Sequence, residues 1–179
     1  ALELLGELLA RGLAPNIRCC GAAISACEKG KQWERAVLLL FSLDSLRVAP
    51  DTISFNAAVS ACGKARRWRE ALQLLFLMRA RRLVPTVVSY SAAITACERQ
   101  RQWELSLALL DEMQSLDVRP DAVAFNAAVS SCESGAQWER SLVLLLASPC
   151  RGSRPSTQGR NAAVSACAKG RAWELAALL

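Results

Sequence analysis

Apolar residues recur along the chain in pairs of short helical patterns that are separated by polar turns. In the segment 52–86 the first pattern places four residues at positions i, i+3, i+4 and i+7, on one face of an α-helix: Phe55, Ala58, Val59 and Cys62. A polar turn at 65–67 follows, and the helical spacing then resumes in a second set: Trp68, Ala71, Leu72, Leu75 and Met78. The two patterns predict a hairpin of two antiparallel helices.

This hairpin pattern repeats with a constant period of 35 residues. All five tryptophans keep the interval, as do five of the eight cysteines and five of the six prolines. The residues are Trp33, Trp68, Trp103, Trp138 and Trp173; Cys27, Cys62, Cys97, Cys132 and Cys167; and Pro15, Pro50, Pro85, Pro120 and Pro155. A fixed period of this size indicates stacked supersecondary units.

We expect these units to form one solenoid domain. Residues 1–16 would be the end of a preceding repeat, and residues 157–179 a partial fifth repeat. The four complete repeats between them are 17–51, 52–86, 87–121 and 122–156. Because the chain begins and ends inside a repeat, we expect it to be a fragment of a longer array.

Two local signals mark the turn and the start of each second helix. Gly30, Gly135 and Gly170 open the turn in three repeats, and glycine suits the left-handed cap that follows a helix. A glutamate follows the tryptophan in four repeats, where its charge meets the positive end of the helix dipole: Glu34, Glu104, Glu139 and Glu174. In the fourth repeat Pro149 predicts an early end of the second helix, because proline cannot continue it.

A single hairpin cannot bury enough apolar surface to fold alone. Ordering each residue costs about 1–2 kcal/mol, whereas each buried large side chain contributes about 1.5–3 kcal/mol. Alanine pairs would let neighbouring first helices approach closely: 22/23, 57/58, 92/93, 127/128 and 162/163. We therefore expect an all-α fold, a right-handed α-solenoid of stacked antiparallel helix hairpins with a continuous inner groove.

The periodic cysteines and tryptophans are expected to pack inside this array. Helices of neighbouring repeats pack about 10 Å apart, whereas thiolates that share a zinc ion lie about 2.3 Å from it. Burial of free thiols as small hydrophobic groups is therefore favoured over a metal site. The tryptophans begin the apolar face of the second helix, so we expect them to pack and not to stack on a ligand.

Composition removes most enzyme classes. The chain has no histidine, no CxxC pair and no phosphate-binding glycine-rich loop, so we expect no catalytic residues, no metal and no cofactor. No apolar run approaches the roughly 18 residues of a membrane span. The 22 Lys and Arg residues exceed the 16 Asp and Glu residues, and the net charge of +6 favours a polyanionic partner.

The polar residues of the first helices form a second stripe. In the second repeat it consists of Asn56, Ser60 and Lys64, which share a face because they are four residues apart. Equivalent sets follow: Ser91, Thr95 and Arg99; Asn126, Ser130 and Ser134; Asn161, Ser165 and Lys169. A solvated face would accept longer polar residues at these positions. Short groups that both donate and accept suit base edges, and the cations suit phosphates.

Several segments resemble pentatricopeptide repeats of the pure 35-residue, or P, type. The resemblance rests on Thr52-Ile53-Ser54-Phe55-Asn56, on Val87-Val88-Ser89-Tyr90-Ser91, and on the closing Pro50-Asp51 and Pro120-Asp121. It extends over essentially the whole chain. The tetratricopeptide repeat has a period of about 34 residues, and its register would slip along the chain, whereas the tryptophans show no slip.

The resemblance implies that each repeat reads about one base of single-stranded RNA, with its fifth residue and its last residue. The implied pairs are Gly21 with Asp51, Asn56 with Thr86, Ser91 with Asp121 and Asn126 with Ser156, followed by Asn161 without its partner. Implied wedges between bases are Ile53, Val88 and Val123, and implied phosphate contacts are Lys29, Lys64, Arg99 and Lys169. Departures from the family pattern are Arg18 and Gln158 at wedge positions, Gly21, Ser134 at a cation position and Arg160 at an aromatic position.

The leading hypothesis is therefore sequence-selective binding of single-stranded RNA, without a cofactor. The resemblance also implies a role in RNA processing, stability or translation in a chloroplast or mitochondrion. The alternative is a helical scaffold that binds a protein partner and does not contact RNA. In this family enzymatic activity resides in appended domains, and the chain has no HxE and PCxxC segment of the deaminase kind.

Overall fold

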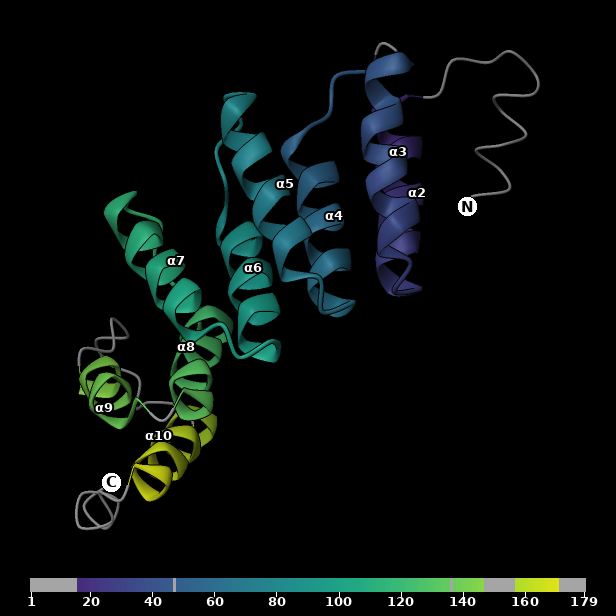
Figure 1. Ribbon diagram of the computed structural model, residues 1–179. Coiled ribbons are helices and arrows are strands. Elements are labelled where there is room, and N and C mark those ends of the chain that lie inside the picture. Colours follow the sequence, from purple (N-terminus) through teal and green to yellow (C-terminus); the bar gives the residue numbers. More distant parts are fainter. Residues whose placement is uncertain (1–15, 47, 136, 147–156, 171–179) are drawn as a thin grey trace. The chain divides into compact units, whose positions relative to one another are not determined.

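The computed structural model describes residues 16–46, 48–135, 137–146 and 157–170, and within these ranges all regular secondary structure is α-helical (Figure 1). The helices are α2 (Ile17–Lys29), α3 (Trp33–Ser45), α4 (Thr52–Lys64), α5 (Trp68–Ala80), α6 (Val87–Arg99), α7 (Trp103–Ser115), α8 (Ala122–Ser134), α9 (Trp138–Leu146) and α10 (Thr157–Lys169). First helices and second helices alternate, and equivalent helices start 35 residues apart from Ile17 and Trp33 onward. The predicted all-α hairpin fold is confirmed.

At three repeat boundaries the last residue of one repeat caps the first helix of the next. The side chain of Asn16 accepts the backbone N–H of Cys19 at 2.8 Å, and that of Asp121 accepts the N–H of Ala124 at 2.8 Å. Asp51 forms a complete capping box with Ser54. These bonds satisfy backbone donors that a helix N-terminus leaves open. The short polar residues at this position therefore have a structural role in addition to any role in recognition.

The second helices begin at the tryptophans, as the hydrophobic pattern predicts. Their first turns carry Glu34, Glu104 and Glu139, whereas Glu174 lies outside the described residues. The predicted early end of the second helix in the fourth repeat also falls outside them, because α9 is described as far as Leu146.

The predicted left-handed conformation of the turn glycines is wrong. The φ angles of Gly30 and Gly135 are −79° and −92°, and the N–H of Gly30 still donates to the carbonyl of Ala26 at 3.0 Å. These glycines continue the helical hydrogen bonding. The positive φ falls one residue after Gly30, on Lys31 (55°), and at the equivalent position of the third repeat, Arg101 (57°), which follows Gln100.

The chain forms two compact units, residues 1–93 and 94–179, each with its own packing. In the first unit α4 contacts α2, α3 and α5; in the second, α8 contacts α7, α9 and α10. Phe55, Val59 and Met78 are fully buried in the first unit, and Val129, Leu145 and Ala163 belong to one core cluster in the second. No described helix is long and apolar enough to cross a membrane.

Small residues permit the contact between successive first helices. The second alanine of each pair is fully buried: Ala23, Ala58, Ala93, Ala128 and Ala163. The five periodic cysteines are buried as predicted, with free thiols. Burial raises the pKa of Cys62 to about 12 and the pKa of Cys97 to about 11. These thiols are therefore protonated at neutral pH and behave as small apolar side chains.

Candidate nucleic-acid interface

The predicted wedge residues are large aliphatic side chains that face solvent. Ile53 is 68% exposed, and Val88 and Val123 are each 57% exposed. They are the second residues of α4, α6 and α8, next to the polar fifth residues. Arg18 and Gln158, which replace the aliphatic wedge in two repeats, are exposed as well. We call the surface formed by the second, fifth and thirteenth residues of the repeats the first-helix face.

One predicted base-reading pair is brought into direct contact in the first unit. Nδ2 of Asn56 donates to Oγ1 of Thr86 at 3.1 Å, although the residues are 30 positions apart. The carbonyl oxygen of the same amide accepts a hydrogen bond from Ser89. Both members of the pair are partly exposed, so the amide is held by protein groups and still reaches solvent.

The remaining predicted base-reading residues lie in different surroundings. Gly21 has no atom within 4 Å of the place where a Cβ would stand. Ser91 is 7% exposed, and its hydroxyl donates to the carbonyl of Val87 at 2.7 Å. Asn126 is partly exposed and Asn161 is exposed, whereas Ser156 lies outside the described residues. Asp51 and Asp121 are the helix caps, and Ser91 and Asp121 belong to different units.

A glutamate that the sequence analysis did not single out contacts the predicted phosphate-binding lysine in the first unit. Oε1 of Glu28 accepts a hydrogen bond from Nζ of Lys64 at 2.9 Å and another from Oγ of Ser60 at 2.7 Å. The Glu28 side chain is 22% exposed and that of Lys64 is 41% exposed. The ammonium is therefore shared between a carboxylate and solvent.

The second unit repeats this arrangement. Oε1 of Glu133 accepts from Nζ of Lys169 at 2.7 Å and from Oγ of Ser165 at 2.6 Å. Burial raises the pKa of Glu133, whereas hydrogen bonds from Lys169 and Ser165 and the charge of Lys169 lower it. The lowering effects together are larger, so the pKa lies below its ordinary value. Ser130 likewise donates to Glu98 at 3.1 Å.

The serine in each of these contacts lies 32 positions after its glutamate, three fewer than the 35-residue period. The lysine lies 36 positions after the glutamate, one more than the period. We call Glu28, Glu98 and Glu133 the acidic ladder. The signal was present in the sequence, because each glutamate is the twelfth residue of its repeat and the next repeat offers a hydroxyl at its ninth position. The register between successive first helices was needed to join the two positions.

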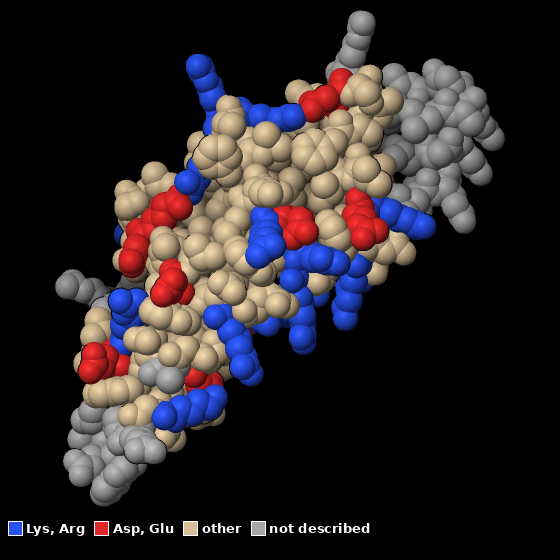
Figure 2. All heavy atoms as spheres, viewed as in Figure 1, with Lys and Arg blue, Asp and Glu red and all other residues tan. Residues whose placement is uncertain are grey.

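Two residues of the acidic ladder, Glu98 and Glu133, line an open polar cavity of about 550 Å³ in the second unit. Its walls are formed by Glu98, Arg99, Arg101, Ser130, Glu133, Ser134 and Lys169. Figure 2 shows positive and negative side chains interleaved on the face in view, in keeping with this mixed lining. Lys64, Arg99 and Lys169 are therefore set among carboxylates. Lys29 and Arg99 are exposed, at the C-terminal ends of α2 and α6.

The described tryptophans are partly exposed, and Trp103 and Trp138 lie against the turn of the following repeat. A Cβ built on Gly135 would stand 2.7 Å from Cγ of Trp103, and one on Gly170 would stand 2.8 Å from Cγ of Trp138. The guanidinium of Arg140 lies over the Trp103 ring at 5.0 Å. The predicted burial of these rings inside the array is therefore wrong for the described tryptophans, and Trp103 and Trp138 pack instead against the turn of the next repeat. The glycines leave room for the indole rings.

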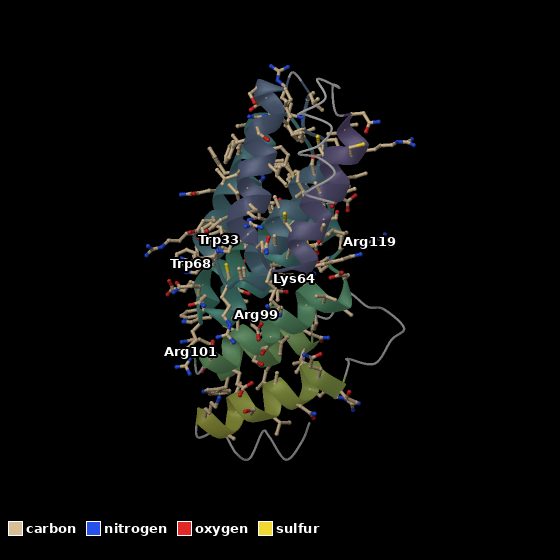
Figure 3. The ribbon with its side chains drawn as sticks, turned by 90° about the vertical axis from the view of Figure 1, so that its right-hand side faces the viewer. Trp33, Lys64, Trp68, Arg99, Arg101 and Arg119 are labelled. Atoms are coloured by element: carbon tan, nitrogen blue, oxygen red, sulfur yellow. The ribbon has the colours of Figure 1, made fainter. Side chains whose placement is uncertain are left out.

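In the first unit Arg67 takes part in the same kind of contact. Its guanidinium lies 4.8 Å from the centre of the Trp33 ring. Figure 3 shows Trp33 and Trp68 at successive positions along one side of this unit. We call the tryptophans and the turns that they contact the tryptophan side.

An apolar groove lies between α3 and α5 in the first unit. It has a volume of about 580 Å³ and is lined by Val37, Phe41, Glu70, Leu72, Gln73, Leu74, Phe76 and Leu77. Phe76 is 73% exposed and Phe41 is exposed as well. The groove is formed by second helices, so it is separate from the first-helix face.

Comparison with protein-family models gave three overlapping matches. The pentatricopeptide repeat domain matches residues 3–65, the PPR repeat family residues 50–99, and the PPR repeat residues 88–118. Each model describes a small number of repeats, and together they extend without a gap over residues 3–118. Comparison with curated proteins gave no match.

Solved structures share the fold. The pentatricopeptide repeat protein PPR10 from maize is 22% identical with a TM-score of 0.72, over 92% of this chain and 23% of that chain. PPR10 in complex with an 18-nt psaJ RNA element gives 22% identity and a TM-score of 0.74, over 97% of this chain and 26% of that chain.

The PPR domain of Arabidopsis thaliana protein-only RNase P 1, solved with tRNA, is 10% identical with a TM-score of 0.75. The match covers 88% of this chain and 84% of that domain. This chain spans about a quarter of the PPR10 chain. With its 35-residue helix hairpins, its capped first helices and the matches of three repeat models, the chain belongs to the pentatricopeptide repeat family.

Proposed function

We propose that this chain binds single-stranded RNA on the first-helix face, with sequence selectivity and about one base per repeat. The observation that carries the proposal is the exposure of Ile53, Val88 and Val123 beside short polar side chains. Apolar side chains of this size gain free energy when they leave water, and the faces of unstacked bases offer a flat apolar surface. Adjacent groups such as the Asn56 amide offer donors and acceptors to a base edge.

Two of the structural relatives support RNA as the ligand. PPR10 was solved with an 18-nt RNA element, and the PPR domain of protein-only RNase P 1 was solved with tRNA. The net charge of +6 favours the same class of partner. By the family's rules, repeats two to four would prefer a pyrimidine, guanine and cytosine in 5′ to 3′ order.

The test is retention of short random-sequence single-stranded RNA on a filter at several salt concentrations. Each phosphate contact contributes about −0.7 to the slope of log affinity against log salt for a single strand, so four first-helix cations give a limit of about −3. We expect a shallower slope, because Lys64 and Lys169 are shared with carboxylates. A slope of zero, or equal retention of all sequences, would contradict the proposal.

A second candidate function is a scaffold that binds a protein partner. The apolar groove between α3 and α5 favours it, because exposed aromatic residues in a groove commonly mark interaction sites. The filter experiment separates the two functions, since a scaffold predicts no salt-sensitive RNA retention. Replacement of Phe76 by Ser would weaken partner binding and leave RNA binding unchanged.

We further propose that the protein containing this chain acts in RNA processing, stability or translation in a chloroplast or mitochondrion, and that this chain contributes binding instead of catalysis. The family resemblance supports this assignment. Fractionation of cells that express the full-length protein with an epitope tag tests it. Recovery in the cytosol alone would contradict the organellar assignment and leave the RNA-binding proposal intact.

A further inference from the structure

The side-chain amide of Asn56 is held by two hydroxyls from the start of the following repeat. Asn56 lies in α4, whereas Thr86 precedes α6 and Ser89 lies in its first turn, and all three belong to the first unit. Nδ2 of Asn56 donates to Oγ1 of Thr86 at 3.1 Å, and Oγ of Ser89 donates to Oδ1 of Asn56. An amide offers donors at one end and an acceptor at the other, so its partners decide which end faces which part of a bound base.

Ser89 is arranged as a donor toward Asn56. Its oxygen accepts the backbone N–H of Thr86 at 2.9 Å, and the side chain is fully buried. A hydroxyl has one hydrogen, and two other acceptors lie near it: Oγ1 of Thr86 at 3.3 Å and the weakly accepting sulfur of Met78 at 3.9 Å. Oδ1 of Asn56 is the closest of the three, so it receives this hydrogen.

The distance between Asn56 and Thr86 agrees with this orientation of the amide. Hydrogen bonds from N–H to oxygen span about 2.7–3.2 Å, and those from O–H to oxygen span about 2.5–3.0 Å. The 3.1 Å contact with Thr86 therefore fits the amide nitrogen. One hydrogen on Nδ2 and one lone pair on Oδ1 remain for a ligand.

We propose that Ser89 is a positioning residue for base recognition by Asn56, an inference that rests on the proposed RNA-binding function. Ser89 holds the donor and the acceptor of the amide in one arrangement. A base whose edge matches that arrangement binds better than the others. Without the hydroxyl the amide flips between two arrangements that suit different bases, and selectivity falls. The third residue of one repeat thereby contributes to recognition by the repeat before it.

The other repeats provide a matched control. Ser54 occupies the same third position, is equally buried and takes part in a capping box with Asp51. The repeat before it has Gly21 at the fifth position, which has no side chain to hold. Ser54 and Ser89 therefore share the contact with the last residue of the preceding repeat, and Ser89 alone of the two also contacts a side chain at the fifth position of that repeat.

The experiment measures base preference at every nucleotide for the full chain and for Ser89→Ala and Ser54→Ala. Random-sequence single-stranded RNA is bound, recovered on filters and sequenced. In Ser89→Ala we expect the preference at the nucleotide assigned to the second repeat to fall about fivefold, the effect of one hydrogen bond of ordinary strength. The other positions keep their preferences. Ser54→Ala loses stability to a similar extent and keeps the preference at the nucleotide assigned to the second repeat, and Ser89→Thr retains the hydroxyl and the preference.

A second pair of variants tests the inference without changing Ser89. Gly21→Asn places an amide in open space next to a repeat whose third residue is Ser54. We expect a new base preference at the nucleotide assigned to the first repeat, and a weaker one in the double variant Gly21→Asn with Ser54→Ala. Full preference in Ser89→Ala, or an equal loss in Ser54→Ala, would overturn the inference. Equal retention of all RNA sequences by the unmodified chain would instead overturn the proposed function.

Discussion

The tryptophan side and the first-helix face follow the same 35-residue period but tolerate different degrees of variation. Every repeat has tryptophan at the same position, and two of the turns that these rings contact have a glycine where a Cβ would collide. The fifth position of the first helix holds Gly, Asn, Ser, Asn and Asn in successive repeats. The rings must fit a fixed space against the next repeat, whereas the fifth position accepts side chains from glycine in open space at Gly21 to a nearly buried serine at Ser91.

This contrast suggests how the two regions divide stability from recognition. Close packing makes the array sensitive to the shape of each ring and turn. Exposure of Ile53 and its equivalents costs stability, because it leaves apolar surface in water. Substitutions on the tryptophan side should therefore change unfolding more than RNA binding, and those on the first-helix face should do the reverse.

The largest expected effect is that of Trp103→Ala. The ring contacts Gly135 and Arg140 and is partly exposed, so we expect a loss of about 3 kcal/mol, at the lower end of the range for core aromatics. Urea unfolding followed by circular dichroism measures it, with RNA binding tested at a temperature where the variant remains folded. Unchanged unfolding together with lost RNA binding would place the ring on the recognition surface.

Gly135→Ala should act through the same ring. The new methyl group would force the indole of Trp103 to move, at a cost of about 1–3 kcal/mol. Gly30→Ala is the matched control, because its Cβ would lie 3.4 Å from the carbonyl oxygen of Ala26, an ordinary van der Waals distance, and we expect no loss of stability. In the Trp103→Ala background the cost of Gly135→Ala should disappear. An equal loss of stability in both backgrounds would show that Gly135 is needed for a reason other than its contact with the Trp103 ring.

Ser91→Asn should change recognition with little change in stability. Asparagine occupies the same position in the second and fourth repeats, so the site accepts its size. By the family's rules the preference at the third-repeat nucleotide should move from guanine to uracil, and a wrong base costs about 1–3 kcal/mol. Competition binding with RNAs that differ at this nucleotide measures the change. An equal effect on all four bases would show that Ser91 does not read the base.

The smallest expected effect is that of Glu28→Gln combined with Glu133→Gln. Exposed ion pairs contribute about 0.2–1 kcal/mol, so stability should change little. Lys64 and Lys169 would become available to phosphates, and the salt dependence of RNA binding should steepen toward the limit of about −3. Glu98→Gln is the control, because the position equivalent to these lysines holds Ser134. A slope that does not steepen would show that the carboxylates do not compete with phosphate.

The lowered pKa of Glu133 gives the same test a pH dependence. A carboxylate with a lowered pKa in the folded state stabilises the fold above its unfolded pKa, and this contribution is lost as pH falls through the folded value. Acidification should therefore weaken the ion pair between Glu133 and Lys169. Its effect on RNA binding should have the same direction as the effect of Glu133→Gln. The glutamine variant should lack this dependence.

The sequence alone was sufficient to predict the helices and their period. Hydrophobic spacing within a helix is a local property, so Trp33 and Trp68 marked the second helices and the residues around Phe55 marked a first helix. The burial of the periodic cysteines followed from the same pattern. The wedge positions came from the resemblance to pentatricopeptide repeats, and the structure shows that Ile53, Val88 and Val123 are exposed.

The tertiary structure decided how residues of different repeats meet. The sequence did not reveal that Glu28 accepts hydrogen bonds from Ser60 and Lys64. It also did not reveal that the Trp103 ring leaves no room for a Cβ at Gly135, or that Ser89 donates a hydrogen bond to the side chain of Asn56. Nor did it place the left-handed residue at Lys31 instead of Gly30. Each of these depends on the register between stacked helices or on the path of a turn. The 35-residue period shows which positions of the repeats are equivalent. The register between the helices of one repeat and those of the next is set only when their surfaces pack together.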